Sequence, residues 1–209
     1  MSFTIVALPE EKTLKELNIL KNYFYQNGFR YINKECKENA HITMLQLSSQ
    51  IPSNFYKQLQ DLIVLNHPFS LENFSLWLKE HKRVFNSPEW RKKYPEGCWW
   101  FTLLFPNNIQ LIQLAKKIRA LTLKLGIDSS LEYAQNIATA TWEFDKNFNL
   151  FEYLCNHMNI CNYIRLDKMI KAKKIFENQF STKKIIFDKI ALVDNQQNII
   201  WVIHLTELI

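Results

Sequence analysis

Two stretches of the sequence repeat the same order of predicted elements, and this repeat is the strongest constraint on the fold. Each stretch begins with an apolar strand, continues into an amphipathic helix and ends in a strand with polar residues at alternate positions. The two units span Phe3–Leu47 and Cys98–Trp142. Elements of this kind must bury their apolar faces against one another. The repeat therefore predicts an α+β fold of two related lobes around a cleft.

The 209 residues, with only 3 Gly and 6 Pro, are predicted to form a single domain, 1–209. One lobe would comprise roughly 1–50 plus 131–209, and the other roughly 51–130. Outside the two units, apolar spacing predicts a helix over Phe148–Ile164. It also predicts a closing hairpin made of the strands Ile185–Val193 and Ile199–Leu205.

The segment Ala40–Leu47 is predicted to be a strand, because it is rich in β-branched and apolar residues and contains neither Gly nor Pro. Residues two apart in a strand share a face, so His41 and Thr43 point the same way. An imidazole beside a hydroxyl can move a proton and hold a phosphate oxygen. The alternative interpretation is a structural strand that merely carries a polar face.

The net charge of +6 favours an anionic partner such as nucleic acid or a nucleotide. A Lys-rich surface kept for solubility explains the charge equally well. The four Cys show no CxxC spacing and are predicted to be free thiols in a reducing compartment. No signal peptide or membrane-spanning segment is recognisable, so a cytoplasmic protein without a membrane partner is expected.

Several parts of the chain together resemble the 2H phosphoesterases, a superfamily that includes the 2′-5′ RNA ligase-like proteins and cyclic nucleotide phosphodiesterases. The resemblance rests on the opening strand Phe3–Leu8 with Pro9, the Ala40–Thr43 motif, the strand Trp99–Phe105 with the helix behind it, and the hairpin Ile190–Leu205. The family carries two His-x-Thr/Ser motifs on equivalent strands of two lobes. The resemblance implies two pseudo-symmetric lobes of antiparallel sheet with outer helices around a central cleft.

The second motif of the family is degenerate in this sequence. Its best match places Asn136 where the second His belongs and Ala138 where its Thr belongs, with Asn136 lying 95 residues after His41. A register shifted by three residues places Thr139 and Thr141 there instead. Neither register supplies a second His. His157 has no recognisable motif around it, and His204 lies in the last predicted strand, which does not carry the family motif.

The resemblance implies a metal-independent phosphodiesterase without a cofactor, a hydrolase acting on a 2′,3′-cyclic phosphate or 2′-5′ phosphodiester of RNA or a nucleotide. His41 would serve as acid/base and Thr43 would bind the phosphate, with activity impaired because the second His is absent. The alternative is a catalytically degenerate fold that serves as an RNA- or nucleotide-binding module. A third interpretation is an α+β domain with no anion site.

The sequence offers further candidate contacts with RNA, from lysine and tryptophan side chains. Lys171, Lys173 and Lys174 belong to a Lys-rich insert that would guide RNA or touch phosphate, although a solvated charged face is an equal alternative. Trp99 and Trp100 alternate on their strand, so one faces each way. One of them could stack on a base, with core packing as the alternative for both. A monomer is expected.

Overall fold

The computed structural model describes residues 3–29, 39–47, 50–64, 66–80, 88–93, 95, 97, 99–106, 108–127 and 154–205. Within them, every helix is too short or too polar to cross a lipid bilayer.

The first predicted unit folds as expected. It consists of the strand β1 (Phe3–Pro9), the helix α1 (Glu11–Gln26) and the strand β2 (Ile42–Leu47). Helix α1 ends at a left-handed glycine, Gly28, whose φ is +63°. The amide of Phe29 donates to the carbonyl of Phe24 at 2.9 Å, which closes the last turn of the helix.

The second unit begins with the strand β5 (Trp99–Leu104) and the helix α5 (Ile109–Lys124), both as predicted. The segment 136–142, in which the sequence places its last strand, lies outside the described residues. Beyond that segment, the strand β6 (His157–Ile164) pairs with β5. The remaining elements are α2 (Phe55–Ile63), β3 (Phe69–Glu72), β4 (Ser75–Glu80), α4 (Pro88–Lys93), α8 (Leu166–Gln179), β7 (Lys184–Asp194) and β8 (Ile199–His204).

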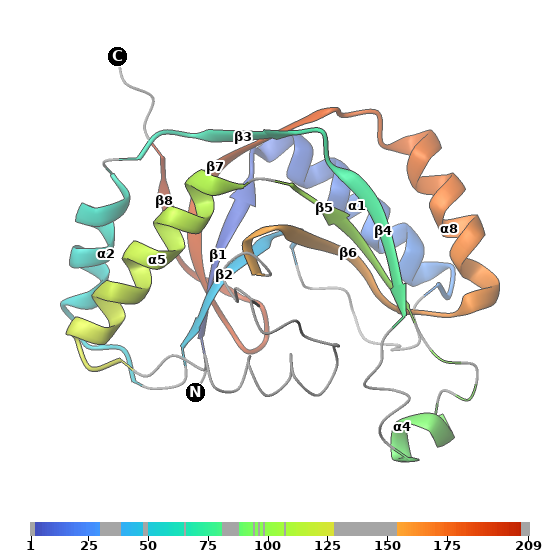
Figure 1. Cartoon of the computed structure of the whole chain (residues 1–209), viewed down its shortest axis with the longest axis horizontal. Helices are drawn as coiled ribbons and strands as arrows, with labels where there is room; N and C mark the ends of the chain where they lie inside the picture. The colour runs from blue at the N-terminus through green and yellow to red at the C-terminus, as the bar shows by residue number, and fades with distance from the viewer. Residues whose placement is uncertain are drawn as a thin grey trace.

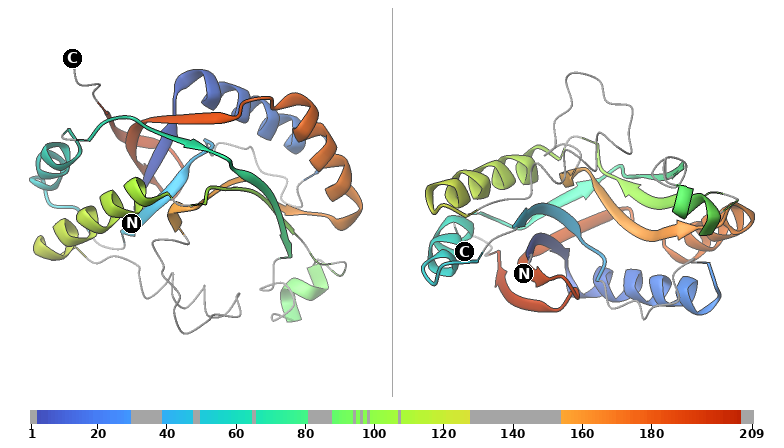
Figure 2. Two further views of the ribbon diagram at one scale, coloured as in Figure 1. Left: turned by 45° about the horizontal axis from the view of Figure 1, so that its top comes forward. Right: turned by 90° about the horizontal axis from the view of Figure 1, so that it is seen from below.

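The described strands form one eight-stranded antiparallel sheet in the order β3-β7-β1-β2-β6-β5-β4, and β8 also pairs with β7. Strand β2 of the first unit meets β6, the neighbour of β5, where Ile42 lies opposite Met158. Figure 1 shows the sheet as a curved layer, with α2 and α5 near one end and α1 and α8 near the other. The two further views in Figure 2 show the same arrangement. This α+β architecture agrees with the predicted fold class.

The helices α1, α2, α5 and α8 pack on one face of the sheet, which we call the core face. Ile42 and Met158 on this face are fully buried, and they belong to the same cluster as the inward residues of α1, α5 and α8. The ring of Phe101 on β5 meets Phe24 of α1 edge-on at 5.8 Å and Phe176 of α8 at 5.4 Å between ring centroids. The core face therefore fixes which side chains of each strand point the other way.

The helix predicted over Phe148–Ile164 is wrong for residues 157–164, which form β6. Strand β6 carries extra residues relative to β5, because Phe101 pairs with Cys161 whereas Thr102 pairs with Asn159. Such a bulge breaks the two-residue alternation of a strand. Buried residues consequently include the neighbours Ile160 and Cys161 as well as Met158 and Ile164, a spacing that resembles an amphipathic helix more than an alternating strand.

Candidate active site

His41, which directly precedes β2, and Thr43 at its start lie on the face of the sheet opposite the core. Ile42, which lies between them, is fully buried in the core, whereas His41 and Thr43 are each partly exposed. Side chains alternate between the two faces of a strand, so His41 and Thr43 share a face. The structure thus places this pair as the sequence predicts.

Strand β6 adds a second polar pair to the same face. Met158 lies opposite Ile42 and is buried with it. Residues directly opposite in an antiparallel pair project to the same face. Counting outward from this pair, Asn159 lies opposite His41 and His157 lies opposite Thr43. We call the face that carries these four polar residues the site face.

The register sets the spacing of the two imidazoles. His41 and His157 are diagonal neighbours across the β2–β6 pair, a relation in which Cα atoms lie about 7–8 Å apart. Their side chains rise from the same face of two rigid strands. Two imidazoles at this spacing can both reach one phosphate group. This arrangement can supply a base and an acid to one phosphorus centre.

The tautomer of His41 is fixed by the backbone. Its Nδ1 lies 2.8 Å from the carbonyl oxygen of Asn39. A carbonyl oxygen can only accept, so Nδ1 carries the hydrogen and donates it. In a neutral imidazole the other nitrogen, Nε2, then holds the lone pair that can take up a proton. The contact therefore prepares His41 to act as a base through Nε2.

Helix α1 holds the residues that precede His41. The side-chain amide of Asn18 donates to Oδ1 of Asn39 at 2.8 Å, and Oδ1 of Asn18 accepts from the amide of Ala40 at 3.0 Å. One asparagine thus satisfies both its donor and its acceptor on the two residues before His41. The carbonyl that fixes the imidazole is thereby tied to the helix.

The residues that precede His157 are anchored in a similar way. Asn108, which caps α5 and is 1% exposed, donates from Nδ2 to the carbonyl of Cys155 at 2.7 Å. The amide of Phe105 donates to the carbonyl of Asn156 at 2.8 Å. Burial raises the pKa of the Cys155 thiol to about 12, so this thiol stays protonated and structural. An asparagine on α1 and another at the start of α5 therefore hold the segments that precede His41 and His157.

Asn159 takes the position that a motif hydroxyl would occupy. The hydroxyl of Thr102 on β5 donates to Oδ1 of Asn159 at 3.0 Å. Thr102 is fully buried and lies opposite Asn159 in the strand register. Because Oδ1 is engaged, the orientation of the amide is set, and its Nδ2 group is the end that can donate to a phosphate oxygen.

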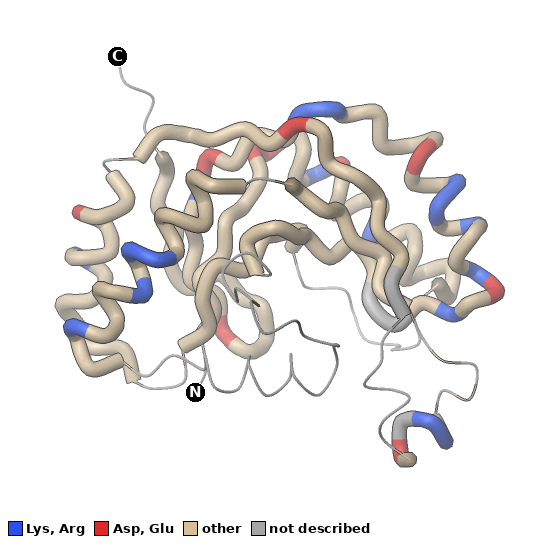
Figure 3. The backbone as a smooth tube through the Cα atoms, viewed as in Figure 1, with Lys and Arg blue, Asp and Glu red and all other residues tan. Residues whose placement is uncertain are grey.

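The other predicted site residues lie elsewhere. Asn136 and Ala138 are outside the described residues. Lys171, Lys173 and Lys174 are exposed on α8, a helix whose Ala172 and Phe176 side chains are buried in the core. Figure 3 shows basic residues along the outer helices α5 and α8. The structure therefore does not bring these lysines together with His41 and Thr43. His204 is exposed at the end of β8.

His157 is the functional candidate that the sequence did not reveal. Its triplet, His157-Met158-Asn159, has the polar–apolar–polar order of His41-Ile42-Thr43 and follows the helix of the second unit. This order is not recognisable from the sequence, because the apolar spacing predicts a helix over Phe148–Ile164 and Asn stands in place of the expected Thr. Within the described residues, no group of three or more His, Cys, Asp or Glu could hold a metal ion.

Comparison with known proteins supports the fold. No protein-family model and no curated protein matches the sequence. The structure of E. coli LigT complexed with 3′-AMP is 12% identical, with 98% of this chain and 97% of that chain covered and a TM-score of 0.50. TT0787 of Thermus thermophilus is 15% identical, with 98% of each chain covered and a TM-score of 0.47. Usb1 of Kluyveromyces marxianus is 7% identical, covers 98% and 97%, and has a TM-score of 0.40.

At these identities the likeness concerns the fold. The similarity to the LigT complex extends over nearly the whole of both chains. The chain therefore shares the fold of that structure, which agrees with the α+β fold that the sequence resemblance implies.

Proposed function

Starting from this fold and the polar residues on its site face, we propose that the protein is a 2H-type phosphodiesterase acting on RNA or a nucleotide. The observation that carries the proposal is the Ile42–Met158 register, which brings the pairs from β2 and β6 onto one face. The sequence suggested a single histidine with Asn136 as a degenerate partner. In the proposed site, His157 supplies the second imidazole, and Asn159 stands in for the second hydroxyl.

The substrate class in the proposal is a 2′,3′-cyclic phosphate or a 2′-5′ phosphodiester. For the cyclic phosphate, Nε2 of neutral His41 accepts a proton from water as its oxygen attacks phosphorus. One of the two ring P–O bonds breaks, and protonated His157 gives its proton to the departing ribose oxygen. The products are a phosphomonoester and a free hydroxyl, so one water is consumed and all atoms balance.

Thr43 and Asn159 complete the proposed mechanism by binding the phosphate. The Thr43 hydroxyl and the Nδ2 group of Asn159 can each donate a hydrogen bond to a non-bridging oxygen. Donors aimed at the place where negative charge builds up lower the barrier, because they require little reorganisation during the reaction. An amide N–H serves this purpose as a hydroxyl does, so Asn159 is compatible with turnover.

The test is turnover of an oligonucleotide that ends in a 2′,3′-cyclic phosphate, measured in the presence of EDTA. His41→Gln and His157→Gln are compared with His204→Gln, the same substitution at an exposed histidine far along the sheet. We expect each site variant to lose about 10²–10⁴-fold in kcat, while His204→Gln stays at the wild-type rate. The double variant should be little worse than either single one, because the two imidazoles act as a unit.

The pH profile separates the two roles. A base and an acid acting together give a bell-shaped dependence of kcat/KM on pH, and each single variant should lose one limb. If His157→Gln keeps the wild-type rate while His41→Gln is inactive, the two-histidine site is wrong. If the wild type binds the oligonucleotide and never cleaves it, the binding-module interpretation replaces the enzyme.

A further inference from the structure

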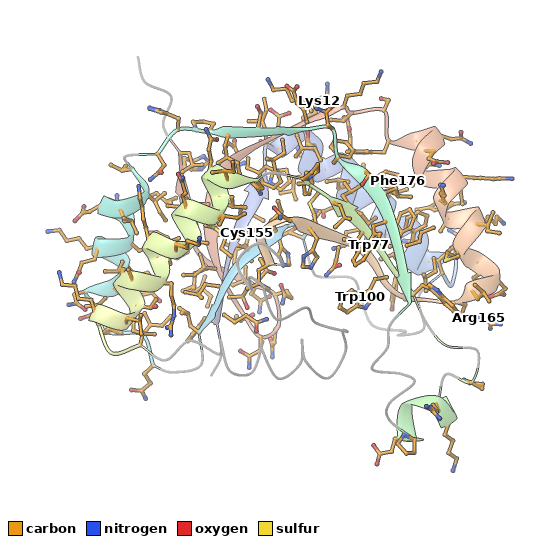
Figure 4. All side chains as sticks on the ribbon, viewed as in Figure 1. Lys12, Trp77, Trp100, Cys155, Arg165 and Phe176 are labelled. Carbon is orange, nitrogen blue, oxygen red and sulfur yellow. The ribbon has the colours of Figure 1, made fainter. Side chains whose placement is uncertain are left out.

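Two tryptophans extend the site face beyond the polar residues. Trp77 on β4 lies opposite Thr102, and Trp100 on β5 lies two residues before it. Thr102 contacts Asn159 on the site face, so both tryptophans project to that face. Leu78 and Phe101, which lie next to them in sequence, pack into the core on the other side. Figure 4 labels Trp77 and Trp100 toward the inside of the curved sheet.

The two indoles are neighbours of each other and of the proposed phosphate site. Trp77 and Trp100 form a diagonal cross-strand pair, a spacing that large aromatic side chains can bridge. Trp77, Thr102, Asn159 and His41 form one row across four adjacent strands. With strands about 4.7–4.9 Å apart, Trp77 lies about 10 Å from Asn159 along this row. That separation is comparable to the reach of one nucleotide from its phosphate.

The face of the sheet distinguishes these two residues from other tryptophans of the chain. Trp99 and Trp201 pack against the main core, and Trp201 meets Tyr56 at 5.9 Å between ring centroids. Trp77 and Trp100 are each partly exposed on the opposite face. Core packing therefore accounts for Trp99 and Trp201, whereas Trp77 and Trp100 present aromatic surface beside the polar residues of the site face.

We propose that Trp77 and Trp100 form a stacking platform for the nucleobase attached to the reacting phosphate. This inference rests on the proposed function and specifies its substrate: a nucleotide or single-stranded RNA end whose base is unpaired and can leave its stack. Every base has a π-face, so the platform favours a base over no base and discriminates weakly among bases. Loss of one stacking partner is expected to weaken binding about 10- to 100-fold.

The test measures equilibrium binding of 3′-AMP by calorimetry, beside base-free ribose 3-phosphate. Trp77→Leu and Trp100→Leu are compared with the wild type and with Trp201→Leu, the same substitution in the core. Thermal melts establish that each variant is folded at the assay temperature. We expect 3′-AMP to bind the two site-face variants about 10- to 100-fold more weakly. Ribose 3-phosphate should bind all folded proteins alike, and Trp201→Leu should match the wild type.

The proposal is overturned if 3′-AMP and ribose 3-phosphate bind the wild type equally, or if Trp77→Leu and Trp100→Leu both retain wild-type affinity for 3′-AMP. Turnover separates this result from a failure of the proposed function. A wild type that cleaves a base-free cyclic phosphate as fast as 2′,3′-cyclic AMP is a phosphodiesterase without the platform. A wild type that cleaves neither, yet binds 3′-AMP in a manner dependent on Trp77 and Trp100, has the platform without the activity.

Discussion

Substitution of Asn18 by Ala tests how the fold holds the proposed base. Asn18 is on α1, and its side chain bonds to Asn39 and to the amide of Ala40. Both contacts are partly buried, and Asn39 in turn supplies the carbonyl that accepts from His41. Removal of the amide group therefore unties the segment 39–41 from the helix while leaving His41 and Thr43 unchanged.

The expected loss of stability follows from two hydrogen bonds. Each contributes about 0.5–1.5 kcal/mol net, so Asn18→Ala should lose about 1–3 kcal/mol from this source. Alanine also has a better helix propensity than asparagine, by up to about 0.7 kcal/mol, which hides part of the loss. Asn22→Ala is the matched control, because Asn22 is exposed one turn further along the same helix. The difference between the two variants isolates the hydrogen bonds.

The assay is urea unfolding, followed by turnover at a temperature where both variants are folded. We expect Asn18→Ala to unfold about 1–3 kcal/mol more easily than Asn22→Ala. A displacement of His41 by about 1 Å would lower kcat up to about 10²-fold, with the loss absent from Asn22→Ala. Equal unfolding midpoints and equal kcat values for the two variants would refute the reasoning, because the network would then hold neither the fold nor the base.

Two further predictions follow from shifted pKa values. With a pKa of about 12 for Cys155, only about one thiol in ten thousand is ionised at pH 8. Iodoacetamide should therefore modify Cys155 only in urea. Modification of Cys155 in the folded protein would contradict the burial of this thiol. Hydrogen bonds from Asn198 and Gln196 lower the pKa of Asp194, so Asp194 stabilises the fold at neutral pH. This contribution disappears as pH falls below the ordinary Asp value of 3.8. The urea midpoint should therefore drop more between pH 5 and 2 in the wild type than in Asp194→Asn, and equal slopes would contradict the prediction.

Regular local patterns made much of the fold predictable. Helix α5 has strictly periodic apolar residues and a stopping glycine, Gly126, whose φ is +65°. The predicted hairpin near the C-terminus also forms, as β7 and β8. In these segments the local preference and the tertiary packing agree, so the pattern alone gives the correct element.

Strand β6 was not predictable because tertiary pairing overrides its local pattern. Its bulged register against β5 turns both Ile160 and Cys161 toward the core, which no alternating pattern anticipates. His157 and Asn159 can be recognised as a pair on one face only when residues 157–164 are known to form a strand. Because the sequence pattern predicts a helix there, it does not reveal this half of the candidate site. His41 directly precedes β2 and Thr43 lies at its start, ahead of the irregularity where Ile5 pairs with Leu45 and Val6 with Thr43. The local alternation therefore predicts the shared face of this pair from the sequence.

The Ile42–Met158 pair makes the candidate site an all-or-none property of strand alignment. If β6 slid by one residue along β2, Met158 would emerge on the polar side and His157 would be driven among apolar side chains. Such a slip moves His157 and Asn159 together, because both flank the buried Met158 and share the opposite face. A deletion of one residue within β6 should therefore be more damaging than a change of any single side chain in it. The chemistry of the proposed site therefore depends on the alignment of β6 with β2 as much as on the identity of the residues in these strands.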